Sequence, residues 1–146
     1  MKRDSSLAPL SHEHQHGLAV ALQLKRATAE TARAAKAEFI SFWKDEGERH
    51  FRAEEELLLP AAARYVPAAH AAVVRVLVEH VELRRRAADL ALTPVPEPDD
   101  LHALGDHLHQ HIRHEERILF PLIEDSLPEA ELGELAGVLG RAEILP

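Results

Sequence analysis

Two segments of the sequence place a glutamate four residues after a histidine, inside a repeated pattern. Residues 50–60 read HFRAEEELLLP and residues 111–121 read HIRHEERILFP, with six identities in eleven positions. Positions i and i+4 of a helix lie on one face, one turn apart, so each histidine and its glutamate point the same way. A neutral imidazole and a carboxylate are suitable ligands for Fe²⁺, Mn²⁺ or Zn²⁺. The repeat therefore predicts four metal ligands: His50, Glu54, His111 and Glu115.

A weaker echo of the pattern precedes each repeat. It consists of the dipeptides Glu13-His14 and Glu79-His80. We interpret the chain as two related helical hairpins, each with a lone histidine followed by a His-x-x-x-Glu pair. Packed about a pseudo-two-fold axis, the hairpins would bring four histidines and two glutamates together. The predicted metal ligands are therefore six: His14, His50, Glu54, His80, His111 and Glu115.

The helix faces that carry these residues strengthen the prediction. All four histidines lie within apolar stripes, as Leu104, Leu108 and Leu119 do on the stripe of His111. Burying two carboxylates there without partners would cost several kcal/mol each, and bound cations would remove that cost. The alternatives are hydrogen-bonded core histidines and weak ion pairs on solvated helix faces. Both alternatives would have to hold on four helices at once, so we favour metal.

Other histidines and glutamates carry separate predictions. His107 lies one turn before His111 and is a fifth ligand, a residue that orients one, or a solvated residue near the bundle end. Glu46 is a similar candidate to support the histidine one turn after it. Glu55 and Glu116 face about 100° away from the ligand carboxylates, which favours pairing with arginines. Surface placement is expected for the remaining histidines: His12, His16, His70, His102, His109 and His114.

Two competing metal motifs overlap the first helix. Residues 12–16 read HEHQH and match the H-E-x-x-H pattern of zinc peptidases. In that register His12 and His16 would bind metal, but their face is less apolar than that of His14, and both repeats stay unexplained. Glu13 with His16 fits the E-x-x-H of ferritin-like di-iron proteins, which need that motif on two helices. The chain has it once, so we reject both.

Helices must position these ligands. Ala, Leu, Glu and Arg dominate the composition, and only 6 residues are glycine. Ser11 is expected to cap the first helix, Pro67 to open the third, and Asp99 or Asp100 to cap the fourth. Three alternating prolines make residues 93–99 an extended connection. The expected helical segments span about 11–29, 31–64, 67–92, 99–125 and 128–141.

These segments predict an all-α fold. Four long helices with short connections favour an antiparallel up-and-down four-helix bundle, with the short C-terminal fifth helix as a lid over one end. The 146 residues are enough for one domain, with a core over about residues 7–125.

Composition excludes several kinds of partner and cofactor. The formal net charge of −8 argues against nucleic acid or an anionic membrane as a partner. Without cysteine, disulfides, zinc–thiolate sites and iron–sulfur clusters are excluded. No run approaches about 20 apolar residues, and no apolar signal region follows residues 1–6. We therefore expect a cytoplasmic protein.

The order of the predicted ligands resembles that of the hemerythrin-like (HHE) cation-binding domain. It has a histidine on the first and third helices and H-x-x-x-E on the second and fourth. The phrases EH at 13–14, HFRAEE at 50–55, HIRHEER at 111–117 and FP at 120–121 are of its kind. The resemblance covers about residues 7–125 and is more specific for the fold and metal site than for the physiological role.

The resemblance implies a centre of two iron ions, Fe²⁺ or Fe³⁺, bridged by two carboxylates and a solvent-derived oxo or hydroxo group. Manganese or zinc in place of iron is left open. By position, Glu54 and Glu115 would bridge the ions. The terminal ligands would be His14, His50, His80 and His111.

The sequence departs from the oxygen-carrying members of that family. Those use five histidines, two on the third helix, and a five-residue His-to-Asp spacing on the fourth. Here the third helix offers only His80, and Glu115 follows His111 by four residues. Each iron would then keep an open position, which suggests a more reactive centre than an oxygen store. Binding by His107 would close one of them.

Three functions compete at this point. The first is a non-enzymatic protein that binds O₂, NO or iron itself for sensing, storage or redox response. The second is a di-iron enzyme that reduces peroxide or oxidises a small substrate. The third is a metal-free helical bundle with a structural role. We favour the first, with the native metal, the oligomeric state and any protein partner left open.

Overall fold

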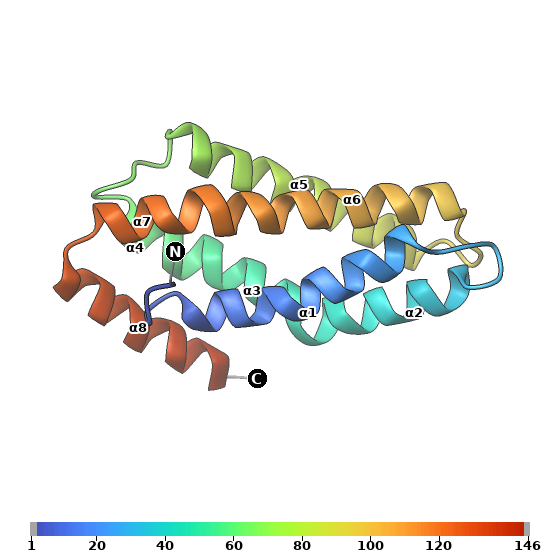
Figure 1. Ribbon diagram of the computed structural model, residues 1–146, viewed down its shortest axis with the longest axis horizontal. Helices are drawn as coiled ribbons and strands as arrows, with labels where there is room; N and C mark the ends of the chain where they lie inside the picture. The colour runs from blue at the N-terminus through green and yellow to red at the C-terminus, as the bar shows by residue number, and fades with distance from the viewer. Residues whose placement is uncertain (1–2, 145–146) are drawn as a thin grey trace.

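The computed structural model describes residues 3–144, and every regular element in that range is a helix (Figure 1). Three elements, labelled η, are single π-helical turns that continue the α-helices on either side. The helical stretches are α1 (Ala8–Lys25); α2 (Ala32–Phe42), η1 (Trp43–Gly47), α3 (Glu48–Ala53), η2 (Glu54–Leu58) and α4 (Leu59–Ala62); α5 (Ala71–Ala91); α6 (Pro98–His114), η3 (Glu115–Leu119) and α7 (Phe120–Ser126); and α8 (Glu129–Ile144). The prediction of an all-α helical bundle is confirmed.

Three helix starts differ from the prediction. Helix α6 begins at Pro98, inside the stretch expected to be extended, with Glu97 as its N-cap residue. Asp99 and Asp100, one of which was expected to cap it, therefore lie in its first turn.

The first helix begins at Ala8, because Pro9 is well suited to a first turn, and Ser11 lies inside the helix instead of capping it. Helix α5 begins four residues after Pro67. There His70 has extended backbone, and its Nδ1 accepts a hydrogen bond from the Ala72 N–H at 3.1 Å. The capping side chain, and not the proline, therefore sets the start of α5.

Helices α1 and α6 make the most extensive contact and lie side by side in Figure 1. Gly105 permits their close approach. A Cβ atom on Gly105 would lie 2.7 Å from the Ala21 carbonyl oxygen and 3.0 Å from the Leu24 Cβ. Because backbone cannot move aside cheaply, glycine is required where α6 crosses α1.

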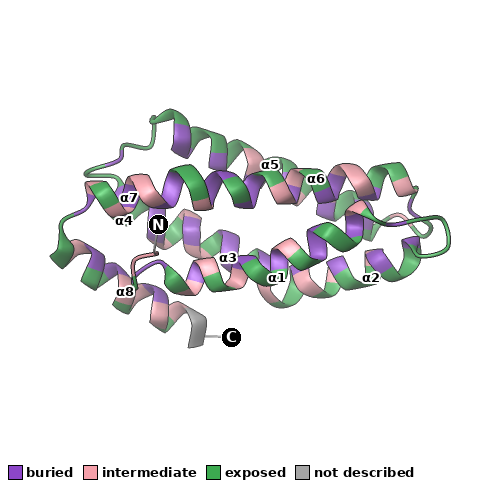
Figure 2. Ribbon diagram, in the orientation of Figure 1, coloured by how far each residue is buried: buried purple, intermediate pink, exposed green. Residues whose placement is uncertain are grey.

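The buried apolar side chains form two clusters, and buried residues recur along each helix in Figure 2. We call them cluster A and cluster B. From the four long stretches, cluster A includes Leu10, Leu58, Val76 and Leu119. From the same stretches, cluster B includes Ala21, Trp43, Leu83 and Leu108. On each stretch the predicted ligands lie between its cluster A residue and its cluster B residue, so a polar layer divides the core.

Helix α8 completes cluster A. Its buried side chains are Leu132, Leu135 and Leu139, and the helix contacts η2. The predicted short helix at residues 128–141 is therefore present and extends to Ile144.

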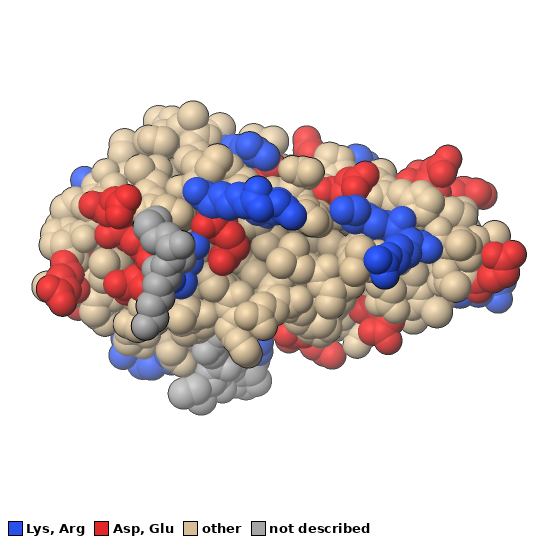
Figure 3. Space-filling view, viewed as in Figure 1, with Lys and Arg blue, Asp and Glu red and all other residues tan. Residues whose placement is uncertain are grey.

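The face of the molecule shown in Figure 3 is mixed in charge. On this face, acidic and basic side chains are interspersed over the helices. None of the helices within residues 3–144 combines the length and apolar character needed to cross a membrane.

Candidate metal centre

The structure brings the six predicted ligands together in the interior. All are buried, and Glu54 and Glu115 are 0% exposed. Their donor atoms form two groups that share both glutamates, and the donor atoms of each group lie within 4.8 Å of one another. The first group is His14, His50, Glu54 and Glu115, and the second is Glu54, His80, His111 and Glu115.

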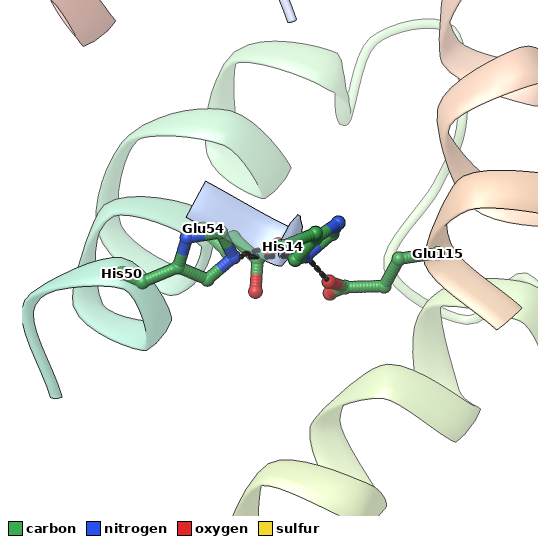
Figure 4. A group of neighbouring side chains, drawn as sticks. All are labelled: His14, His50, Glu54 and Glu115. Atoms are coloured by element: carbon green, nitrogen blue, oxygen red, sulfur yellow. Dashed lines mark hydrogen bonds and ion pairs between the residues drawn. The ribbon is translucent and has the colours of Figure 1, made fainter. Parts of the chain in front are cut away.

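In the first group the four side chains point toward one another (Figure 4). His14 comes from α1, His50 from α3, and the glutamates begin η2 and η3. The Nε2 atom of His14 lies 3.1 Å from the Nε2 atom of His50 and 2.9 Å from Glu115 Oε1. The His50 Nε2 lies 3.2 Å from Glu54 Oε2.

The second group mirrors the first. His80 comes from α5 and His111 from α6, and their Nε2 atoms lie 3.2 Å apart. The His80 Nε2 lies 3.1 Å from Glu54 Oε1, and the His111 Nε2 lies 3.4 Å from Glu115 Oε2. Each carboxylate therefore presents one oxygen to each histidine pair, which is the geometry of a carboxylate that bridges two ions.

The spacing of the imidazoles also suits metal ions. Two nitrogens bound at about 2.1 Å in perpendicular positions of one ion would lie about 3 Å apart. The observed separations of 3.1 and 3.2 Å match that value.

The buried carboxylates test whether the site fits cations. Both oxygens of Glu54 and the Oε2 of Glu115 lack a hydrogen-bond partner within the described chain. The neighbouring imidazole nitrogens are at ion-pair distance but are not aligned to donate to them. Leaving such oxygens unsatisfied would cost several kcal/mol, and a divalent cation between them would satisfy them. The residues present therefore fit a two-metal site.

A second layer of glutamates supports the histidines, and none of these contacts was predicted from the sequence. Each of the four predicted ligand histidines has its Nε2 toward the centre and its Nδ1 toward an outer carboxylate. The Nδ1 contacts are His14 with Glu116 at 2.9 Å, His50 with Glu13 at 3.2 Å, His80 with Glu55 at 2.6 Å and His111 with Glu79 at 2.8 Å. An Nδ1–H that donates to a carboxylate leaves Nε2 free to bind metal and fixes the ring orientation.

Arginines stand behind these glutamates. Arg49 lies 3.5 Å from Glu13, and Arg75 Nε lies 3.1 Å from a Glu79 oxygen. Glu55 and Glu116 also pair with arginines, as the sequence predicted, through Arg84 at 3.0 Å and Arg3 at 3.8 Å. Their contacts to histidine were not predicted, since both were expected only to face away from the site.

As protein groups alone, the imidazoles and carboxylates compensate one another's charge. Burial opposes protonation of His80 and His111, but the carboxylates of Glu54 and Glu115 outweigh it. The pKa of His80 is raised to about 9 and that of His111 to about 10. Burial likewise opposes ionisation of Glu115, yet the charge and hydrogen bonds of the imidazoles hold its pKa well below the usual value.

Of the remaining predictions, two concern residues that lie away from the donor groups. His107 contacts Arg86 at 3.1 Å, and its side chain is 42% exposed, so it belongs to neither group. Glu46 pairs with His16, which is outside the two donor groups. The surface placement of His114 is wrong: it is buried, and its Nε2 lies 2.9 Å from the Ala72 carbonyl oxygen. The start of α5 covers it, a tertiary contact that helix spacing does not reveal.

A small cavity of about 20 Å³ lies beside the His14–His50 pair. This volume exceeds the roughly 10–15 Å³ needed to hold one water-sized molecule. Apolar residues and glycines make up much of the wall: Gly17, Phe42, Gly47, Phe51, Leu108 and Ile112. The other lining residues are Glu13, His14, Glu46, His50 and His111. By its size, the space suits a small molecule better than a bulky one.

Comparison with known proteins gives one match. A family model described as the Hemerythrin HHE cation binding domain matches residues 6–123. The matched range contains both repeats, both preceding dipeptides and all six residues of the two donor groups. Neither the curated proteins nor the solved structures give a match to this chain.

Proposed function

The chain belongs to the hemerythrin HHE cation-binding domain family, and from that premise we propose that it binds two iron ions between its six buried ligands. His14 and His50 would hold one ion, and His80 and His111 the other. Glu54 and Glu115 would bridge both. The single observation that carries this proposal is the sharing of both carboxylates between two histidine pairs, one oxygen to each.

The setting of this centre is part of the proposal. We place it in one domain built as an antiparallel up-and-down four-helix bundle, with α8 as the short additional helix. Within it each ion would receive two imidazole nitrogens and two carboxylate oxygens from protein. Further coordination positions would remain for solvent and for a small ligand. Iron in such a site supplies reversible redox chemistry and affinity for diatomic molecules.

The proposed ligand is O₂ or NO, bound for sensing, storage or a redox response. The cavity beside His14 and His50 supports this, because about 20 Å³ suits a molecule of water-like size and excludes most organic substrates. The cavity therefore favours a binding protein over an oxidase of organic compounds.

Metal content tests the ligand assignment. Protein loaded with Fe²⁺ without oxygen and then desalted should contain two iron ions per chain by elemental analysis. His50→Ala and Glu54→Ala should each bind clearly less iron, while His107→Ala, which alters a histidine outside the donor groups, should still bind two. Wild-type protein without stoichiometric metal, or Glu54→Ala with unchanged iron, would contradict the assignment.

Gas binding tests the function separately. The reduced, iron-loaded protein should change its visible spectrum on exposure to O₂ or NO, and removal of the gas should reverse the change. A loaded protein that consumes peroxide much faster than free iron does, without reversible gas binding, would instead support the enzymatic alternative.

A further inference from the structure

Two of the four proposed ligand histidines, His80 and His14, have neighbours of the same three kinds: a phenyl ring, a glutamate and an arginine. His80 stacks on the Phe51 ring with 3.8 Å between ring centroids and 6° between ring planes. The guanidinium of Arg84 lies over the same phenyl ring at 5.7 Å. Arg84 also binds both oxygens of Glu55 at 3.0 Å, and Glu55 accepts from His80 Nδ1 at 2.6 Å. One arginine thus holds both groups that fix the His80 ring.

His14 has matching neighbours. It stacks on Phe120 at 5.5 Å with 11° between ring planes, and the Arg3 guanidinium lies over that phenyl ring at 5.5 Å. Arg3 also lies 3.8 Å from the Glu116 carboxylate, which is 2.9 Å from His14 Nδ1. Again one arginine contacts both the phenyl ring and the carboxylate that fix a ligand histidine.

The internal repeat does not account for this match. Arg84 follows His80 by four residues, and the residue four positions after His14 is Leu18. Arg3 instead precedes α1. The two arginines therefore reach equivalent places from different parts of the chain, which indicates that each half of the centre needs a cation there.

The two arginines differ in how firmly the chain holds them. Arg84 lies within the 21-residue helix α5. Arg3 lies in the segment before α1, which attaches across η3 and α7 through an Arg3–Glu124 ion pair and a 2.6 Å hydrogen bond from the Asp4 N–H to Glu124. Arg3 also donates to the Glu116 carbonyl oxygen at 2.6 Å. Releasing these few contacts needs no helix to unwind, so this segment should open at a lower free energy than α5.

We propose that Arg3 and Arg84 are paired positioning residues, one for each half of the centre, and that residues 3–6 form a latch that sets how fast the His14–His50 half exchanges its metal. This rests on the proposed two-metal site. When the latch opens, Glu116 and Phe120 lose the cation that holds them, and the His14 ring can turn away. The His80–His111 half keeps Arg84 and stays closed.

Metal release measures the two halves separately. Protein loaded with two Zn²⁺ ions is mixed with excess chromogenic chelator, and wild type should release them in two phases of one ion each. Arg3→Gln should accelerate one phase by about ten- to one-hundredfold, the usual effect of losing such outer support, and leave the other unchanged. Arg84→Gln should accelerate the other phase. The matched control is Arg52→Gln, because Arg52 is exposed and, within the described residues, its ion pair is with the exposed Glu56.

Nitrogen-15 NMR of the Zn²⁺-loaded protein assigns each effect to a histidine. Arg3→Gln should speed solvent exchange of the His14 Nδ1–H, and Arg84→Gln that of His80. Arg3→Lys, which keeps the positive charge, should restore part of the slow release. Glu124→Gln loosens the latch without altering Arg3 or Glu116, so it should reproduce the Arg3→Gln effect in folded protein.

The outcomes separate the latch from the metal site. Wild type that holds two Zn²⁺ ions, with Arg3→Gln and Glu124→Gln changing neither phase or both phases equally, would overturn the latch and leave the metal site standing. Wild type that holds no Zn²⁺ and no Fe²⁺ would overturn the proposed function itself.

Discussion

At the scale of single residues, the centre uses neighbouring residues for different tasks. In Glu79-His80 the histidine points to the centre, while the glutamate accepts from His111 on the adjacent helix. In Glu54-Glu55 the first glutamate lies between the histidine pairs, and the second supports His80. Consecutive helix positions are about 100° apart, so a residue next to a ligand reaches the outer side of a histidine on another helix. In each dipeptide, one residue faces the centre and the other contacts a histidine on a different helix.

Loss of an outer carboxylate should weaken metal binding without removing a ligand. Glu79→Gln should lower the affinity for Zn²⁺ by about tenfold or more, because His111 loses the acceptor that orients its ring. Competition titration with a chelator measures the affinity. Glu82→Gln on the same helix is the control, and equal affinities in the two variants would show that Glu79 has no such role.

The buried histidines should give metal-free protein a characteristic pH dependence. The pKa values of about 9 for His80 and about 10 for His111 lie above the usual 6.5, so folding favours their protonated forms. Their contribution to the free energy of unfolding is complete below pH 6.5 and is lost as the pH rises through about 9 and 10.

Urea unfolding in the presence of chelator checks this dependence. The urea concentration at the unfolding midpoint should decrease as the pH is raised from 7 to 10. This decrease should be smaller in His111→Ala than in His107→Ala. A wild-type midpoint that rises over this range would contradict the raised pKa values.

At the scale of elements, the repeat is associated with a backbone conformation, the π-helical turn, as well as with the predicted ligands. Turns η2 and η3 begin at the two shared glutamates, Glu54 and Glu115, and each ends two residues before a proline. In each, the N–H of the residue just before the proline bonds to the carbonyl oxygen of the shared glutamate, five residues back. Proline provides no N–H and crowds the preceding turn, and the wider turn accommodates it without ending the helix. At both Glu54 and Glu115, a proline in the sequence thus goes with a widened helical turn that begins at the glutamate.

Contact between α1 and α6 gives a prediction at this scale. Gly105→Ala should destabilise the protein by about 1–3 kcal/mol, because the new methyl group meets the Ala21 carbonyl oxygen. Gly133→Ala is the matched control in α8. With nothing within 4 Å of its Cβ position, it should instead stabilise by about 0.5–1 kcal/mol. Urea denaturation measures both, and similar values for the two variants would argue against close packing at Gly105.

The sequence predicted what depends on spacing within a helix and missed what depends on contacts between helices. The grouping of His50 with Glu54 follows from one helical turn, and burial of His14 and His80 from their apolar stripes. The support of His80 by Glu55 depends on how α5 packs beside η2, which no spacing reveals. Burial of His114 under the start of α5 was missed for the same reason. The π-helical turns were also missed, because the spacing of residues along a helix does not reveal where one of its turns widens.

At the scale of the whole molecule, a polar layer separates cluster A from cluster B. Apolar packing alone therefore stabilises each half of the bundle, while the layer between them depends on charge compensation. Under the proposed ligand assignment, metal ions would satisfy that layer and join the two halves of the core.

Metal removal should therefore lower stability measurably. Free Zn²⁺ at one hundred times its Kd stabilises a one-site protein by about 2.7 kcal/mol, which for a chain of this size corresponds to a Tm shift of about 5–10 °C. Chelator should lower the Tm of wild type by at least this amount and have little effect on Glu54→Gln. An unchanged wild-type Tm would show that metal does not stabilise the bundle.

The sharing of carboxylates has a mechanical consequence. Each hairpin would supply two histidines and one glutamate oxygen to its own ion, and the other oxygen of that glutamate to the ion of its partner hairpin. Both ions would then act as cross-links between the halves of a chain that contains no cysteine. A force that pulls the hairpins apart would have to rupture coordination bonds at both ions, so the loaded protein should resist stretching far better than its apolar packing alone would allow.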